Sequence, residues 1–333
     1  MLLDVQDLTI DIPTASGVLH AVQGISFSVD EGETLCIVGE SGCGKSLTAL
    51  AVMDLLPRRA IRAATSLAFS GRDLRGLSRE AMNRLRGDRI AMIFQEPMTS
   101  LNPVFTIGDQ MIDVLRQHRK VSRREARDRA VYLLDKVGIS SPEARLAQYP
   151  HQLSGGLRQR VMIAMALMCD PKLILADEPT TALDVTIQAE LLRLLMALQQ
   201  EFGMGLVLIT HDLGIVSRMA DKVAVMYAGQ IVESGTAETI FNDPLHPYTQ
   251  GLMACLPAPE RQRMQHLKAI PGAVPALVGA IEGCRFRGRC AHAQPVCERD
   301  VALREPAGAH PYRCVLPAET SRDNARAVLG AGA

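Results

Sequence analysis

The chain has 333 residues, of which 47% are hydrophobic and 22% are charged, and its 36 Lys and Arg residues balance its 36 Asp and Glu residues. This composition is typical of a globular protein with one large domain and a smaller appendage, and it excludes extensive disorder. The neutral charge and the 4% aromatic content argue against nucleic acid as a partner, since proteins that bind it carry basic patches or stacking platforms.

The sequence shows neither a membrane span nor a secretory signal. The longest apolar stretch, VMIAMALMC at 161–169, is well short of the roughly 18 residues that a membrane-crossing helix needs. The N-terminal segment MLLDVQDLTIDI carries acids where a signal would carry a basic region and an apolar run. The eight cysteines are not spaced as a disulfide framework, so we expect a protein of the reducing cytoplasm.

Short apolar segments separated by helical patterns occupy the first 235 residues. Residues 3–10 and 25–29 are predicted strands, and LCIV at 35–38 is a short buried strand that ends at a glycine-rich turn. A helix is expected from Ser46 to Leu56. Buried strands that alternate with helices are typical of an α/β fold with a parallel sheet. The later predicted strands are IAMIF at 90–94, LILA at 173–176, LVLIT at 206–210 and VAVMY at 223–227.

Two regions depart from this alternation. Residues from about 97 to 155 are polar and favour helix, so we interpret them as an inserted helical subdomain. The Lys and Arg clusters at 58–89 and 116–129 are interpreted as solvated helix faces, the alternative being a contact surface for acidic partners. After Gly235 the chain becomes rich in Pro and Gly, which indicates a boundary. We therefore expect one domain at 1–235 and a loop-rich extension at 236–333.

A phosphate-binding motif follows the predicted strand at 35–38. The sequence GESGCGKS matches G-x-x-x-x-G-K-[ST] and stands between a strand and a helix, as a phosphate loop must. Its glycines let backbone N–H groups turn toward phosphate oxygens, Lys45 can reach the β and γ phosphates, and Ser46 can bind Mg²⁺. The predicted ATP-binding residues of this loop are Gly39, Glu40, Ser41, Gly42, Cys43, Gly44, Lys45 and Ser46.

Two adjacent carboxylates end the predicted strand at 173–176. Asp177 is expected to hold Mg²⁺, directly or through water, and Glu178 is expected to polarise the attacking water as a general base. A lone pair of acids at a strand end is more often simply solvated, but the phosphate loop upstream favours catalysis.

LSGG at 153–156, followed by LRQRVMIAMAL, resembles the signature motif of ABC (ATP-binding cassette) ATPases. The resemblance implies a P-loop (RecA-like) nucleotide-binding domain with a helical subdomain and an N-terminal antiparallel β subdomain. It also implies that the signature of one cassette closes over the ATP of a second, through backbone N–H groups at a helix start. Leu157 stands where the commonest form has Gln. The signature residues are Leu153, Ser154, Gly155 and Gly156.

Further motifs of the family follow in the expected order. Gln95 resembles the Q-loop glutamine that senses Mg²⁺, so the magnesium ligands implied are Ser46, Gln95 and Asp177. TALD at 181–184 resembles the D-loop with Asp184, and His211 matches the switch histidine near the γ phosphate. No aromatic residue stands at the usual adenine-stacking position, where the nearest candidates are Leu19 and His20.

The segment after 235 narrows the resemblance. HPYTQGL at 246–252, IPGAVPAL at 270–277 and the cysteines of GCRFRGRC are similar to the C-terminal extension of ATP-binding subunits of oligopeptide and dipeptide importers. Four thiols with spacing C-x5-C-x6-C-x16-C could converge on a metal, although the spacing alone fits neither a common zinc knuckle nor a common ferredoxin pattern. The resemblance implies a [4Fe-4S] cluster, and free thiols or zinc are the alternatives. These cysteines are Cys284, Cys290, Cys297 and Cys314.

The resemblance implies an ATP- and Mg²⁺-dependent motor for peptide import at the cytoplasmic face of the inner cell membrane. Its implied partners are a second cassette, which the family favours as a paralogue, two transmembrane permeases and an extracytoplasmic substrate-binding protein. Cargo is set by those other chains, and relatives of this extension also serve glutathione and nickel chelates.

Three other classes of ABC protein are the alternatives. A soluble ABC ATPase that acts on nucleic acid or ribosomes would show tandem cassettes, a long coiled-coil insertion or a strongly basic surface. An exporter motor is disfavoured by the HPYT segment and the cysteines. A non-hydrolysing regulatory cassette is disfavoured because Lys45, Asp177, Glu178 and His211 are all present.

Overall fold

A computed structural model describes residues 1–180, 184–255, 270–279 and 281–329, except for the side chains of residues 97, 98 and 185. These residues form two compact units. Unit 1 holds residues 1–3, 29–34 and 68–209, and unit 2 holds residues 4–28, 35–67 and the described residues from 210 onward. In the part of the chain that is described, no helix is long and apolar enough to cross a membrane.

Unit 1 contains a ladder of parallel strands. β7 (Ile90–Ile93) pairs with β8 (Leu173–Asp177), and β8 pairs with β9 (Gly205–Thr210), with Ile93 opposite Ala176 and Asp177 opposite Ile209. Every residue of β8 is buried. Strands covered on both faces need continuous apolar runs, which explains why these three were readable from the sequence. All three predicted strands are confirmed.

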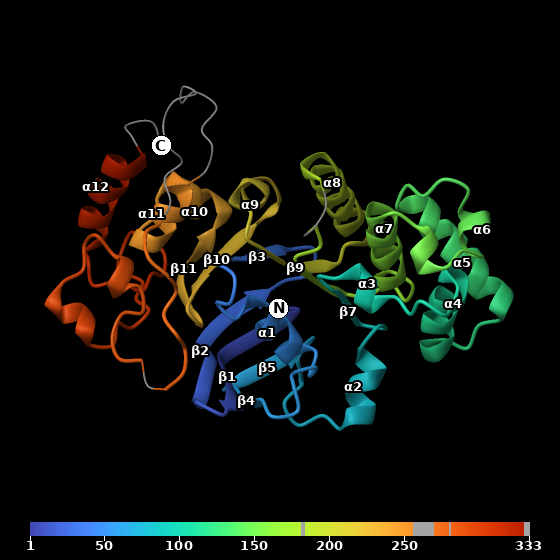
Figure 1. The fold of residues 1–333 in the computed structure, drawn as a ribbon, viewed down its shortest axis with the longest axis horizontal. Coiled ribbons are helices and arrows are strands. Elements are labelled where there is room, and N and C mark those ends of the chain that lie inside the picture. Colours follow the sequence, from blue (N-terminus) through green and yellow to red (C-terminus); the bar gives the residue numbers. More distant parts are fainter. Residues whose placement is uncertain (181–183, 256–269, 280, 330–333) are drawn as a thin grey trace. The chain divides into compact units, whose positions relative to one another are not determined.

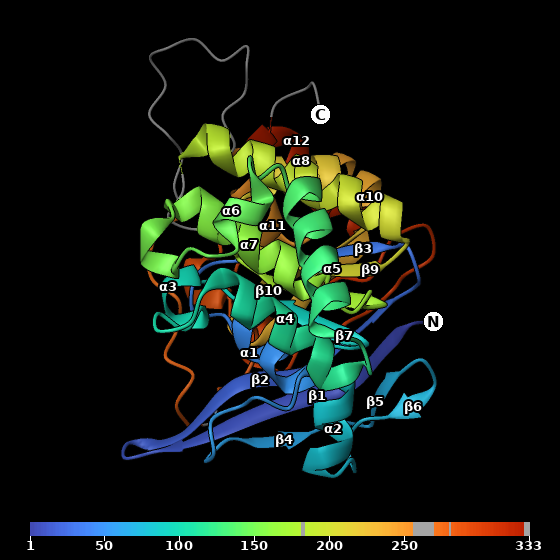
Figure 2. The same ribbon diagram turned by 90° about the vertical axis from the view of Figure 1, so that its right-hand side faces the viewer.

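The helical part of unit 1 lies within residues 97–166. Thr106 and Ser122 cap two of its helices, and Ser122 forms a capping box with Glu125. No strand occurs among the described residues from 97 to 155, in agreement with the expected helical subdomain. Figures 1 and 2 show its helices gathered as one cluster. They are α3 (Pro97–Ser100), α4 (Ile107–His118), α5 (Arg123–Lys136), α6 (Pro142–Arg145), a 3-10 turn (Pro150–Gln152) and α7 (Gly155–Ala166).

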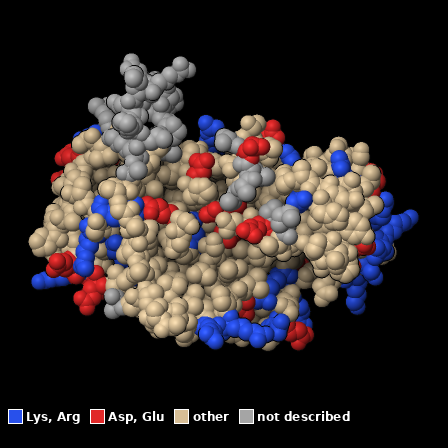
Figure 3. All heavy atoms as spheres, in the orientation of Figure 1, with Lys and Arg blue, Asp and Glu red and all other residues tan. Residues whose placement is uncertain are grey.

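Basic side chains gather over α4 and α5 (Figure 3). Several of them have acidic partners: Arg119 lies 2.7 Å from Asp88, and Arg123 forms an ion pair with Asp109. Exposed pairs of this kind contribute little stability. The basic cluster at 116–129 is therefore a solvated helix face in which part of the positive charge is paired.

Unit 1 also holds a short hairpin and two further helices. β5 (Ser66–Phe69) and β6 (Arg72–Asp73) pair through Ala68 and Asp73, and positive φ angles at Ser70 and Gly71 make the tight turn. This hairpin was not predicted from the sequence, because neither strand is long enough to show a hydrophobic period. The helices are α2 (Arg79–Leu85) and α8 (Val185–Phe202).

Unit 2 has antiparallel and parallel parts. β1 (Leu3–Thr14) neighbours β2 (Gly17–Val29) and pairs antiparallel with β4 (Ile61–Ala63), as expected for the antiparallel β subdomain. β3 (Thr34–Val38) runs parallel to β10 (Lys222–Tyr227), which pairs antiparallel with β11 (Gln230–Thr236). β4 and β11 were not predicted.

The helix expected from Ser46 to Leu56 is shorter. α1 (Lys45–Val52) ends four residues early, because Asp54 has φ 52° and a left-handed residue stops a right-handed helix. Pro57 follows shortly after. The other helices of unit 2 are α9 (Leu213–Met219), α10 (Ala237–Asn242), α11 (Pro247–Ala254), α12 (Ala318–Leu329) and the 3-10 turns Arg287–Arg289 and Pro295–Glu298.

The extension after residue 236 packs onto the end of the cassette within unit 2. Ser234 N–H donates to Pro311 at 3.0 Å, and Arg313 N–H donates to Val232 at 2.7 Å, so β11 receives a short extra backbone segment. α11 and α12 lie side by side (Figure 1). The division of the chain at residue 235 stays a prediction.

Candidate nucleotide site

The phosphate loop, residues 39–46, links β3 to α1 in unit 2. All five residues of β3 are buried, which fixes the strand, and the loop leaves it at Gly39. α1 starts after Gly44 with no side-chain cap and no acidic residue in its first turn. Its first N–H groups and its dipole are therefore available to an anion.

Two glycines of this loop are required by close backbone contacts. A Cβ at Gly39, where φ is 156°, would lie 2.0 Å from the Met226 carbonyl oxygen. A Cβ at Gly44, where φ is 102°, would lie 2.6 Å from the Ala21 carbonyl oxygen. No side chain fits at either position, because the backbones of β2 and β10 lie directly against the loop.

Lys45 is folded back over the loop. Its Nζ donates to the Gly39 carbonyl at 2.8 Å and to the Glu40 carbonyl at 3.0 Å, and the residue is only 4% exposed. Cys43 is buried beside it, and burial raises the pKa of its thiol. Cys36, Cys43 and Cys169 are buried free thiols. The lysine is thus held among the backbone groups that would surround phosphate oxygens.

The two predicted acids follow from β8 in unit 1. Asp177 ends the strand and is 6% exposed. Glu178 has φ 42°, which is uncommon for a residue with a side chain, and its N–H donates to Ile209 at 3.0 Å. A carboxylate held in such a backbone conformation is a feature of functional sites.

The structure brings together Gln95 and Glu178. Gln95 follows β7, the neighbour of β8, and its Nε2 donates to Glu178 Oε2 at 3.2 Å. Parallel strands end at the same sheet edge, so residues 83 positions apart meet. The amide thereby holds the carboxylate in one orientation.

The signature motif lies at the start of α7 in unit 1. Ser154 is the N-cap, and its Oγ accepts from Leu157 N–H at 3.4 Å. Leu153 is buried, whereas Ser154 and Gly155 are exposed. Leu157 enters this cap through its backbone, so the capping geometry does not depend on a Gln side chain there.

The remaining predicted residues fall as follows. Asp184 is the exposed N-cap of α8, while the preceding residues of TALD, 181–183, lie outside the described part. His211 directly follows β9 and is exposed, and Asp212 beside it caps α9 through Gly214 N–H at 2.8 Å. His20 Nδ1 lies 2.7 Å from Asp11 Oδ1, so its ring already has a polar partner.

The four extension cysteines share one small cavity. Cys284, Cys290, Cys297 and Cys314 all line a space of about 10 Å³, roughly room for one water molecule. His292 N–H donates to Cys290 Sγ at 3.4 Å, and Gln294 N–H donates to Cys297 Sγ at 3.5 Å. Burial raises the pKa of Cys314 to about 11.

The cavity is not built for one metal ion as it stands. The described residues contain no group of three or more His, Cys, Asp or Glu side chains that could hold such an ion. A four-iron cluster is a different case, because each thiolate binds its own iron and the sulfurs therefore stand farther apart. With room for about one water, the surrounding loops would have to separate to admit a cluster.

Two arginines, Arg285 and Arg313, lie near one of these cysteines, Cys284. Arg285 and Arg313 line a polar cavity of about 320 Å³ together with Cys284. Burial lowers the pKa of Arg285 to about 10 and also lowers that of Arg313. Two positive charges therefore lie beside Cys284, and the Asp300 carboxylate lines the same cavity.

Three polar residues that connect the extension to the cassette, Glu233, Tyr248 and Arg289, were not predicted from the sequence. Glu233 is fully buried and accepts Leu245 N–H at 2.6 Å and His246 N–H at 3.0 Å, and His310 Nε2 lies 2.6 Å from it. Tyr248 and Arg289 both contact Glu40 of the phosphate loop. The HPY sequence was the available signal, but it indicated only a family resemblance and did not predict these contacts.

Comparison with known proteins matches both parts of the chain. A family described as "ABC transporter" matches residues 22–181, and one described as "Oligopeptide/dipeptide transporter, C-terminal region" matches residues 232–297. The oligopeptide transport ATP-binding protein OppD of Bacillus subtilis is 51% identical over 296 residues, 89% of this chain and 83% of the relative. The dipeptide transport ATP-binding protein DppD of the same organism is 48% identical over 298 residues, 89% of each chain.

A solved structure shares the fold. The ATP-binding cassette MJ0796, in a dimeric post-hydrolysis state bound to ADP and Pi, superposes with a TM-score of 0.63 and 26% identity. The match covers 71% of this chain and 99% of that one. The α/β cassette architecture expected from the sequence is confirmed by this match.

Proposed function

This chain belongs to the ATP-binding proteins of ABC transporters, in the oligopeptide and dipeptide family. We propose that it hydrolyses ATP to power peptide import. The observation that carries the proposal is the presence, on one chain, of the phosphate-loop, signature, Q-loop, D-loop and switch-histidine motifs together with the peptide-transporter extension. Two relatives that it covers over most of their length are named for oligopeptide and dipeptide transport.

Within the site, each residue has a role that its surroundings support. Lys45 and the loop N–H groups bind the β and γ phosphates, where they offset the negative charge. Ser46, Gln95 and Asp177 would hold Mg²⁺ through the hard oxygen ligands that this ion prefers, and the ion would neutralise charge on the phosphates.

Hydrolysis needs a base that is held in place. Glu178 accepts a proton from the attacking water, and the hydrogen bond from Gln95 keeps its carboxylate in one orientation. His211 contacts the γ phosphate from the end of β9. The chemistry is phosphoryl transfer to water, in which positioning and charge stabilisation provide most of the rate.

The partners follow from the exposed signature. Ser154 and Gly155 present the N-terminus of α7 to solvent, as a surface that binds the phosphates of a second cassette needs. We propose a paralogous second cassette, two transmembrane permeases and an extracytoplasmic binding protein, with this chain peripheral on the cytoplasmic face of the membrane. Residues 1–235 form the motor and 236–333 the family extension.

We further propose that the four extension cysteines bind a [4Fe-4S] cluster. They share one cavity, two of their sulfurs accept backbone N–H groups, and Arg285 and Arg313 lie beside Cys284. Anaerobic purification with iron, sulfide and absorbance measurements tests this, with Cys290→Ser expected to lose the signal. Cys255→Ser is the control, because Cys255 does not line the cavity. Protein without iron or visible absorbance overturns the cluster assignment.

The transport assignment is tested by trapping the ATP-bound state with Glu178→Gln in gently solubilised membranes. Recovery of two polytopic permeases and a second cassette supports the importer, and the associated binding protein is then screened with dipeptides, longer peptides, glutathione and nickel chelates. Recovery of ribosomes or DNA-processing proteins without a permease contradicts transport and leaves the ATPase activity alone.

A further inference from the structure

The second residue of the phosphate loop is held by two residues of the extension. Glu40 N–H donates to Tyr248 Oη at 3.0 Å, so its backbone is fixed from α11. Its carboxylate receives both arms of Arg289: Nη1 lies 2.8 Å from Oε2, and Nη2 lies 3.1 Å from Oε1. A bidentate pair of this kind specifies direction as well as charge. Extension and loop are thereby joined at one residue.

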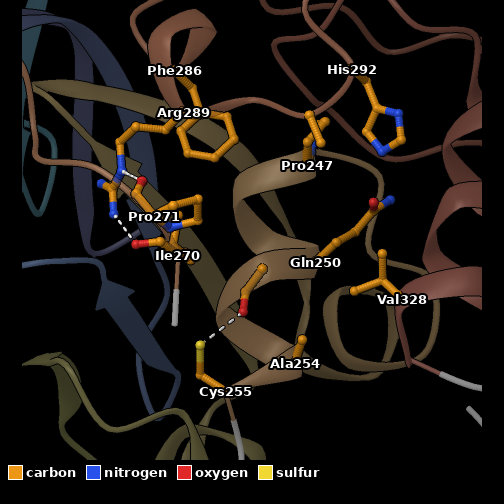
Figure 4. A pocket seen from close by; sticks show the side chains of 12 residues that line it. Pro247, Gln250, Ala254, Cys255, Ile270, Pro271, Phe286, Arg289, His292 and Val328 are labelled. Carbon is orange, nitrogen blue, oxygen red and sulfur yellow. Dashed lines mark hydrogen bonds between the residues drawn. The ribbon is translucent and has the colours of Figure 1, made fainter. Parts of the chain in front are cut away.

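Arg289 is itself fixed before it reaches the loop. Its Nε donates to the Pro271 carbonyl at 2.8 Å, and Nη2 donates to the Ile270 carbonyl at 3.1 Å, as Figure 4 shows from the pocket that these residues line. Nη1 also lies 3.4 Å from Tyr227 Oη, and the side chain is only 7% exposed. Because these contacts already hold the planar guanidinium in place, the Arg289 side chain loses little conformational entropy when it pairs with Glu40.

The charge of Glu40 explains why such a pair matters. The loop has to accept a polyanionic triphosphate, yet its second residue carries a carboxylate that is 28% exposed. An unpaired carboxylate there would repel phosphate oxygens, whereas a carboxylate paired with a buried guanidinium presents almost no net charge. The Glu40 carbonyl also accepts from Lys45 Nζ, so displacement of residue 40 would move the lysine's support.

We propose that Arg289 is a positioning residue for ATP binding: it neutralises Glu40 and, with Tyr248, holds residue 40 so that the loop can receive the phosphates. The extension is then a working part of the nucleotide site of its own chain. This inference rests on the proposed ATPase function and assigns to the extension a role that does not depend on the cargo or on the cysteines.

The test measures MgATP affinity of the full-length chain with a fluorescent ATP analogue. Arg289→Ala is expected to weaken binding about tenfold, the effect of losing about 1.4 kcal/mol. The double variant Arg289→Ala with Glu40→Gln is expected to recover to within about threefold of wild type, because the uncompensated charge is gone. The loss in Arg289→Ala should also shrink as salt rises.

If Arg289 had only a structural role, the double variant would bind MgATP as weakly as Arg289→Ala or more weakly. The loss in Arg289→Ala would then also be independent of salt. Each of these two results overturns the proposal. Arg322→Ala is the matched control, because it breaks another bidentate pair of the extension, to Asp243 at 2.9 and 2.8 Å, with no contact to the loop. It should bind MgATP like wild type.

Two outcomes separate this inference from the function on which it rests. If Arg289→Ala does not fold, Arg289→Gln replaces it, with the same tenfold loss and the same rescue expected. If the wild-type chain itself does not bind MgATP, the proposed function fails, whatever the variants do. If wild type binds and Arg289→Ala binds equally well, the inference fails while the ATPase assignment stands.

Discussion

The phosphate loop and the segment 284–314 are built over different distances along the chain. The loop's internal hydrogen bonds join Lys45 to residues five and six positions away. Arg285 bonds Gln23, 262 positions away, and Arg289 bonds Glu40, 249 positions away. A short pattern can therefore reveal a phosphate loop, whereas the function of the extension becomes visible only when distant residues have been brought together.

The largest effect is expected from a residue that sequence and structure both single out. Glu178→Gln removes the general base while keeping the shape of the side chain, so the ATPase rate should fall about 10² to 10⁴-fold with little change in nucleotide affinity. Steady-state hydrolysis and ATP binding measure the two quantities. Glu80→Gln, an 81% exposed helix position, is the control and should keep full activity. More than a tenth of the wild-type rate in Glu178→Gln would contradict the assignment.

The next largest effect is expected from replacing one glycine in each region, Gly39 in the phosphate loop and Gly283 beside the segment 284–314. A Cβ at Gly283, where φ is 77°, would lie 2.4 Å from the Cys297 carbonyl oxygen, a clash similar to that at Gly39. Gly39→Ala and Gly283→Ala should each lower the free energy of unfolding by about 3 kcal/mol in urea titrations. Gly288→Ala, which meets no atom within 4 Å, should change it by less than about 1 kcal/mol. Equal values for all three variants would show that neither loop is sterically constrained.

A smaller effect is expected where the extension meets β11. Glu233→Gln replaces a buried carboxylate that accepts two backbone N–H groups and faces His310, so the free energy of unfolding should fall by about 2 kcal/mol. Glu238→Gln, an exposed neighbour in α10, is the control and should be neutral. An unchanged urea midpoint in Glu233→Gln would mean that this contact does not hold the extension.

The smallest effect concerns pH. Burial lowers the pKa of His246 to about 3, and its Nδ1 accepts Tyr248 N–H at 3.0 Å. The unfolded chain binds this proton near pH 6.5, so the contribution of His246 is complete above that pH and is lost as pH falls toward 3. Between pH 7.5 and 5.5 the loss should be about 1.4 kcal/mol.

His246→Asn isolates this contribution, because Asn can still accept the capping hydrogen bond but does not titrate. The difference in unfolding free energy between pH 7.5 and 5.5 should therefore be smaller in the variant by about 1.4 kcal/mol. The same pH dependence in both proteins would show that folding does not lower the pKa of His246.

Much of the fold was readable because buried strands need apolar runs. LCIV, LILA and LVLIT became β3, β8 and β9 with bounds within one residue. β11 was missed because QIVESGT is half polar, and its one acid, Glu233, is buried with hydrogen-bond partners that come from later in the chain. The early end of α1 depended on the left-handed conformation of Asp54, which a pattern does not show.

For the candidate site, motifs named the residues, while geometry supplied their relations. Gln95 and Glu178 were each predicted, but their hydrogen bond required the parallel pairing of β7 and β8. Arg289 carried no signal of its own, because one arginine beside a cysteine in a loop-rich segment has no periodicity. Contacts that close over hundreds of residues are set by tertiary packing and leave no trace in a short window.

The pairing of Glu40 with Arg289 also sets an order in time. Synthesis at roughly 5 to 20 residues per second places about 12 to 50 s between the two residues, which are 249 positions apart. During that interval the nascent chain carries the phosphate loop without its counter-charge. On the proposal made above, a chain cut short before Arg289 would keep every ATP motif and still bind nucleotide about tenfold more weakly.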